Sequence, residues 1–213
     1  MTIIPLYLGF VNAYLLKTES GFMLIDTGMK SHRKKIEEQL ARAGCRPGNL
    51  KIIVLTHGDM DHTGNAPYLR EKFQTRIAMH RDDAGAVEHG QLARNQKIIG
   101  RLLMRLMIKT MFKIPRFKPD LLVDDGYNLA DFGFDTEILH IPGHTRGSIG
   151  ILAADGDLFC GDILANRKQP AIGPIVDDPE TLRKSVDRLK DLHIRTVYPG
   201  HGKPFPMSAL VHS

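Results

Sequence analysis

The chain has 213 residues, of which 42% are hydrophobic and 25% are charged. These proportions are typical of a folded globular protein and exclude a disordered or collagen-like chain. The length favours a single domain over residues 1–213. No apolar run approaches the roughly 18 residues that a membrane span needs, and no basic region precedes a signal-like apolar stretch. We therefore expect a soluble, cytoplasmic protein without a transmembrane segment.

The net charge of +5 is concentrated in one segment of the chain. Residues 91–118 hold eight basic residues and no acidic one, so the remainder of the chain is net acidic. A basic surface that binds polyanions would draw on charge from the whole chain. We therefore expect a small-molecule substrate and no nucleic-acid partner.

Apolar runs rich in β-formers alternate with helical patterns along the chain. The first strands open the chain as a meander, and a helix follows at residues 31–43, where Ser31 is the expected cap. Further helices are expected at residues 65–72 and 179–192. The expected strands are 3–8, 11–17, 22–25, 52–55, 75–79, 121–123, 136–141, 148–152, 157–160 and 196–198. This order predicts an α/β fold without internal repeats.

The basic segment has the periodicity of an amphipathic helix from about residue 94 to residue 114. Basic side chains recur there every fourth residue, and apolar side chains mark another side. Three interpretations stay open: a packed surface helix with a solvated basic face, an insert that overhangs a groove as a lid, and a helix that makes peripheral contact with a membrane.

Five short apolar strands end in a turn that holds a glycine beside a titratable residue. Glycine lets the backbone approach closely, and rigid strand ends can place several such residues in one site. The turns are Asp26-Thr27-Gly28, His57-Gly58, Gly143-His144, Gly161-Asp162 and Gly200-His201.

The run from His57 to His62 holds four candidate metal ligands: His57, Asp59, Asp61 and His62. Imidazole and carboxylate groups bind divalent ions, and a nitrogen and oxygen ligand set with an open position is the catalytic arrangement. A polar turn that caps a helix would explain this run alone. It would not explain the further turns with His144, Asp162 and His201, so the sequence predicts a metal site.

The five turns, in this order and spacing, resemble the metallo-β-lactamase-fold hydrolases. The resemblance implies a four-layer αββα sandwich with a dinuclear site, normally of zinc. By position, His57, Asp59 and His144 would hold one ion, Asp61, His62 and His201 the other, and Asp162 would bridge them. The family has a second histidine where this chain has Asp59. An added carboxylate favours harder ions, so manganese or iron stays open beside zinc.

Two metal ions at such a site would lower the pKa of bound water from 15.7 toward about 7 and supply a bridging hydroxide as nucleophile. We therefore expect a metal-dependent hydrolase of a small ester, thioester or lactone. Asp61 is the candidate catalytic residue, placed to pass a proton to the leaving group. Two alternatives remain: an iron-dependent redox enzyme such as a sulfur dioxygenase, and a nucleic-acid phosphodiesterase that uses the basic helix as a clamp.

Overall fold

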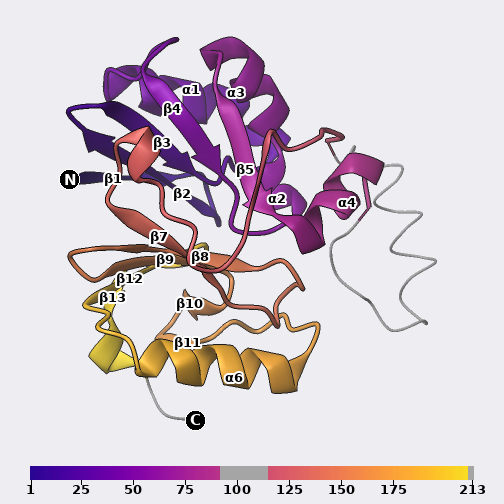
Figure 1. Ribbon diagram of the computed structural model, residues 1–213, viewed down its shortest axis with the longest axis vertical. Coiled ribbons are helices and arrows are strands. Elements are labelled where there is room, and N and C mark those ends of the chain that lie inside the picture. The colour runs from indigo at the N-terminus through magenta and orange to yellow at the C-terminus, as the bar shows by residue number, and fades with distance from the viewer. Residues whose placement is uncertain (92–114, 211–213) are drawn as a thin grey trace.

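The computed structural model describes residues 1–91 and 115–210, which form two β-sheets and their covering helices (Figure 1). The first sheet has the strand order β1-β2-β3-β4-β5-β6. Its first three strands are antiparallel, and β3 to β6 run parallel. The strands are β1 (Thr2–Tyr7), β2 (Asn12–Thr18), β3 (Gly21–Ile25), β4 (Leu50–Val54), β5 (Arg76–His80) and β6 (Leu121–Val123).

The second sheet has the order β13-β12-β9-β8-β7, and only β9 and β12 pair in parallel. A separate two-stranded ribbon is formed by β10 (Leu164–Asn166) and β11 (Pro170–Ile172). The strands of the second sheet are β7 (Thr136–His140), β8 (Ile149–Ala153), β9 (Asp157–Gly161), β12 (Thr196–Pro199) and β13 (Phe205–Pro206).

Helices cover the outer face of each sheet. Figure 1 shows α1 and α3 against the first sheet and α6 against the second. The α-helices are α1 (Arg33–Arg42), α2 (Met60–Thr63), α3 (Ala66–Phe73), α4 (Arg81–His89) and α6 (Pro179–Lys190). The 3-10 turns are η1 (Lys30–His32), η2 (Ala130–Phe132) and η3 (Met207–Ala209).

Three apolar clusters lie between these layers because the strands alternate their side chains between two buried faces. In β3, Leu24 faces the cluster shared with α1 and α3, whereas Met23 and Ile25 face the cluster between the two sheets. In β9, Phe159 faces the cluster between the sheets and Leu158 faces the cluster with α6. The predicted four-layer αββα sandwich is confirmed.

The expected strands and helices are present within a few residues of their predicted bounds. Ser31 does not cap the first helix: it lies in η1, and α1 begins at Arg33 after His32. The sequence reading missed α2 and α4 and the short strands β10, β11 and β13. The predicted basic helix falls largely on residues 92–114, which lie outside the described residues. Within the described ranges, no helix is long and apolar enough to cross a membrane.

Candidate metal centre

The ends of parallel strands from both sheets meet at one edge of the sandwich. In the first sheet, β3 leads into Asp26, and β4 leads through Thr56 to His57. In the second, β9 leads into Asp162 and β12 leads to His201. The carboxyl ends of neighbouring parallel strands open at the same edge of a sheet, where a site can form between the following turns.

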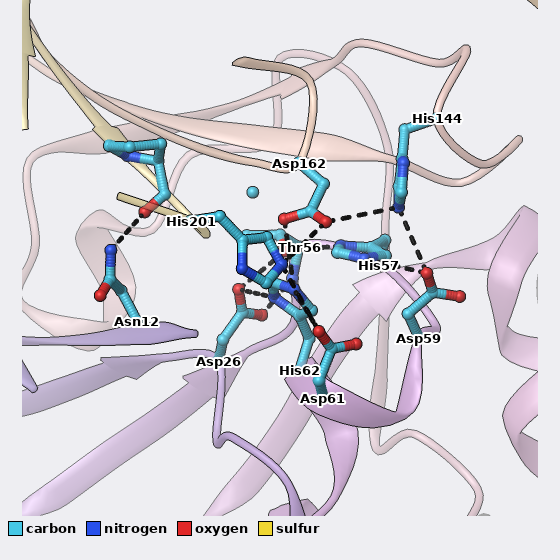
Figure 2. Close-up of polar contacts among 12 residues, drawn as sticks. Asn12, Asp26, Thr56, His57, Asp59, Asp61, His62, His144, Asp162 and His201 are labelled. Carbon is cyan, nitrogen blue, oxygen red and sulfur yellow. Dashed lines mark hydrogen bonds and ion pairs between the residues drawn. The ribbon is translucent and has the colours of Figure 1, made fainter. Parts of the chain in front are cut away.

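All seven predicted ligand residues lie together at this edge (Figure 2). Two groups with converging ligand atoms are His57, His144 and Asp162, and Asp61, His62 and His201. Asp59 belongs beside the first group, because its Oδ2 lies 3.3 Å from Nε2 of His144 and 3.7 Å from Nε2 of His57.

Asp162 stands between the two groups. Its Oδ1 lies 3.3 Å from Nε2 of His62, and its Oδ2 lies 3.2 Å from Nε2 of His201 and 3.9 Å from Nε2 of His144. Asp61 faces the second group, with Oδ2 3.4 Å from Nε2 of His201. One carboxylate therefore touches both groups, and the others each face one.

Hydrogen bonds from the first sheet orient two of the imidazoles. Asp26 Oδ2 accepts from Nδ1 of His62 at 2.7 Å and from Oγ1 of Thr56 at 2.8 Å. Because the Thr56 hydroxyl donates to Asp26, its oxygen is left to accept from Nδ1 of His57 at 3.0 Å. Both rings then carry the proton on Nδ1 and direct the lone pair of Nε2 into the site.

Backbone carbonyls orient the other two imidazoles. Nδ1 of His144 donates to the carbonyl of Ile175 at 2.7 Å, and Nδ1 of His201 donates to the carbonyl of Phe10 at 2.6 Å. A carbonyl oxygen can only accept, so these rings also present Nε2 to the centre. In all four histidines Nδ1 donates away from the centre, and Nε2 is the nitrogen that a metal ion would bind.

The donor atoms at the centre fit divalent metal ions. Ten buried side-chain atoms of the described residues make no hydrogen bond, and four of them lie at this centre: Nε2 of His57, His62 and His144, and Oδ1 of Asp162. Buried polar atoms nearly always have a hydrogen-bond partner. Nitrogen and oxygen atoms that lack one and face one another form a suitable ligand set for a divalent cation.

The charges of the site are strongly coupled. Burial lowers the pKa of His201, but hydrogen bonds to Asp162 and Asp61 outweigh it and raise this pKa to about 9. Burial raises the pKa of Asp162, but the charge of His62 and the hydrogen bond from His201 hold it well below its usual value. In the metal-free protein, positive charges on protonated imidazoles therefore balance the negative charges of the carboxylates. A metal ion must displace these protons, so metal binding should strengthen as the pH rises.

Asp83 of α4 fastens the two loops that carry His57 and His144. Its carboxylate is fully buried and accepts from the backbone N–H groups of Gly58 and Gly147 and from the Thr145 hydroxyl, each at 2.8 Å. Nothing in the sequence around Asp83 singles it out, because two acidic residues at a helix start usually only complement the helix dipole.

The turn after β12 is held by hydrogen bonds from Asn12 in the first sheet, and its glycine at position 200 is closely packed. Asn12 Nδ2 donates to the carbonyls of Pro199 and Gly202 at 3.0 and 2.7 Å. A Cβ on Gly200 would lie 2.4 Å from Oδ1 of Asp162 and 2.7 Å from Cε1 of His62. Gly200 is therefore required by close approach. Asn12 was also not predicted, because the sequence around an asparagine in an expected strand does not indicate which distant groups its side chain binds.

His80, Asp82 and His140 form a third group within reach of one another. The two imidazole rings stack with centroids 4.0 Å apart and planes 10° apart, so their in-plane lone pairs do not converge on one point. His80 Nδ1 accepts from the Asp82 backbone N–H at 3.2 Å. We interpret this group as a hydrogen-bonded stacked pair and not as a metal site.

Three comparisons with known proteins bear on this site. Hydroxyacylglutathione hydrolase GloC of Haemophilus influenzae is 31% identical over 68% of this chain and 62% of the relative. The human acyl-coenzyme A thioesterase MBLAC2 is 27% identical over 91% of this chain and 74% of the relative. The solved structure of TTHA1623 in a di-iron-bound form has a TM-score of 0.74 and 26% identity, covering 98% of this chain and 96% of that one.

A family model matches the part of the chain that carries the site. A model described as the metallo-beta-lactamase superfamily matches residues 6–201, a span that begins in β1 and ends on the last predicted ligand, His201. The matched span contains β2 to β12 and all seven predicted ligand residues. The chain belongs to the metallo-beta-lactamase superfamily of metallo-hydrolases.

Proposed function

We propose that the chain is a metal-dependent hydrolase of a small ester, thioester or lactone, with thioesters favoured. The observation that carries the proposal is the convergence of four imidazole Nε2 atoms and three carboxylates at one edge of the sandwich. Two of the similar proteins are named as hydrolases of acyl thioesters, a hydroxyacylglutathione hydrolase and an acyl-coenzyme A thioesterase.

The ligand sets follow from the two groups of side chains. His57, Asp59 and His144 would hold one ion, Asp61, His62 and His201 would hold the other, and Asp162 would contact both. When bound, such ions lower the pKa of a water molecule to near neutrality and polarise the substrate carbonyl.

The residues of the chain keep this chemistry aligned. The Nδ1 hydrogen bonds hold each imidazole in one tautomer, and the hydrogen bonds of Asp83 hold the loops of His57 and His144 together. Pre-set geometry of this kind lowers the cost of reaching the transition state.

Asp61 is the proposed proton carrier. Burial raises the pKa of Asp61, but the charge of His62 and the hydrogen bond from His201 together lower it below its usual value. Its side chain is 21% exposed, more than any of the other six. An ionised carboxylate that reaches the open side of the site can take the proton of the attacking water and pass it to the leaving thiolate or alkoxide.

The test combines metal analysis with hydrolysis assays on the purified protein. We expect about two divalent ions per chain by the ligand count above, hydrolysis of S-acyl thiols that continues without oxygen, and loss of activity on chelation with recovery on readdition. Chelated protein that hydrolyses as fast as untreated protein would refute the proposal.

The identity of the ion is tested in the same experiment. Zinc is the proposed ion for hydrolysis, whereas the di-iron form of TTHA1623 supports iron as an occupant of the fold. Reconstitution of metal-free protein with zinc, manganese or iron separates these cases by rate. If only the iron form is active, and only with oxygen, the redox alternative replaces hydrolysis.

A further inference from the structure

A cleft of about 1030 Å³ opens beside the second ligand group. Its walls come from Tyr7 at the end of β1 and Phe10 in the turn that follows, from Arg167 after β10, and from Gly202 and Lys203 after β12. Cavities of this order hold small molecules. The cleft lies outside the ligand residues themselves, and the side chains of Tyr7, Phe10, Arg167 and Lys203 have no role in the chemistry proposed above.

The cleft shares a wall with the metal centre. The Phe10 ring stacks on the His201 ring, with centroids 5.8 Å apart and planes 3° apart, and the Phe10 carbonyl accepts from Nδ1 of His201. In Figure 2, Asn12 lies on the side of the site where His201 is found. A molecule that occupies the cleft would therefore lie beside His201, next to the metal centre.

The walls are held in place before any ligand binds. Asn12 ties the first wall to the third through its hydrogen bonds to Pro199 and Gly202. Asn166, next to Arg167, accepts from the backbone N–H of Lys203 at 3.2 Å, and its side chain donates to the carbonyl of Lys203 at 3.0 Å. A preformed cleft loses little entropy on binding.

The charged residues of the cleft are both cations. Arg167 and Lys203 are exposed and make no ion pair within residues 1–91 and 115–210, and no acidic residue lines the cleft. Two uncompensated cations at one opening favour an anion.

The apolar part of the cleft is equally unusual. The side chains of Phe10 and Tyr7 are 58% and 49% exposed, and they are two of the few large hydrophobic residues that are exposed in the described chain. Exposed aromatic faces beside a functional centre typically receive an apolar part of a ligand.

We infer that the cleft binds an anionic group of the substrate. Arg167 and Lys203 take a carboxylate or phosphate, and Phe10 and Tyr7 contact the adjoining apolar portion, so the enzyme prefers acyl thioesters that carry such a group. This inference rests on the proposed hydrolase function and specifies its substrate class.

The test uses the metal-loaded protein and two matched substrate pairs. S-acetyl-4′-phosphopantetheine is compared with neutral S-acetylpantetheine, and S-acetyl-3-mercaptopropionate with its neutral amide. The variant is the double substitution Arg167→Gln, Lys203→Gln, and the control is Lys168→Gln, an exposed basic neighbour that does not line the cleft. The two pairs distinguish phosphate from carboxylate as the preferred anion.

We expect kcat/KM for at least one anionic substrate to exceed that of its neutral partner and to fall about tenfold or more in the double variant, because hydrogen bonds to charged groups are lost. The neutral partners and Lys168→Gln should change less than about twofold, as surface substitutions usually do. Equal kcat/KM within both wild-type pairs, or a parallel loss for neutral and anionic substrates, would overturn the inference.

A binding measurement separates this inference from the proposed function. If none of the thioesters is hydrolysed, the hydrolase proposal is wrong, and calorimetric titration with S-methyl-4′-phosphopantetheine and S-methyl-3-mercaptopropionate, which have no free thiol to bind a metal ion, tests the cleft alone. At least one probe should then bind about tenfold more weakly to the double variant than to the Lys168→Gln control. If neither probe binds the Lys168→Gln control, or if each probe binds the double variant and the control with equal affinity, the cleft is not an anion site.

Discussion

Replacing Asp83 with alanine should destabilise the metal-free protein strongly. The substitution leaves the buried N–H groups of Gly58 and Gly147 without an acceptor, at a cost of about 1–3 kcal/mol each. The Thr145 hydroxyl keeps Ser148 as a partner at 2.7 Å and adds little. The expected loss is therefore about 2–6 kcal/mol, a large part of the roughly 5–15 kcal/mol that stabilises a typical domain.

Urea unfolding of metal-free wild type and variants measures this loss. Asp83→Asn keeps one acceptor oxygen and should lose about 1–3 kcal/mol, because one N–H group then faces an amide N–H₂. Asp82→Asn, an exposed neighbour at the same helix start, should lose less than about 1 kcal/mol. If Asp83→Ala loses no more than Asp82→Asn, the carboxylate does not fasten the two loops as argued.

Three further predictions concern the metal centre and the stacked histidines. Asp26→Asn should weaken metal binding about 10–100-fold in a competition with a chelating dye, since it disturbs the hydrogen bond that orients His62; unchanged affinity would contradict that role. Asp59→Ala should lose one ion per chain by mass spectrometry and retain the other, whereas full occupancy would show that Asp59 is not a ligand. Burial and neighbouring His140 lower the pKa of His80, so the unfolded chain takes up this proton more readily and stability should be lost as the pH falls below the ordinary value of 6.5. His80→Gln should flatten this dependence in urea unfolding between pH 5 and 7.5, a range of about one unit on either side of an ordinary imidazole pKa.

The elements and ligand candidates that were predictable depend on short stretches of chain. The turn from β4 into α2 carries four candidate ligands within six residues, and the strand before it is a plain apolar run. Such local patterns can be recognised in the sequence because a strand and the turn that follows it are adjacent in the chain, whatever the rest of the fold. The structure brings these residues together at one edge of the sandwich, and their role as metal ligands stays a prediction.

The parts that were missed depend on tertiary contacts. Asp83 and Asn12 reach across the fold to loops far away in sequence, and nothing in their own neighbourhood marks them. The carbonyls of Ile175 and Phe10, which fix two imidazole tautomers, belong to the backbone and have no residue signature. Strands as short as β10 and β11 show too little periodicity to be recognised.

Two positions in the turn after β12 differ sharply in the substitutions that they tolerate. Position 200 admits no side chain, because a Cβ there would overlap Asp162 and His62, whereas the side chain of Lys203, three residues later, points to solvent at the cleft. A combinatorial library that diversifies Arg167 and Lys203 and leaves Gly200 untouched should yield new specificities without loss of ion occupancy. Selectivity and metal retention are thus separable engineering targets within one short loop.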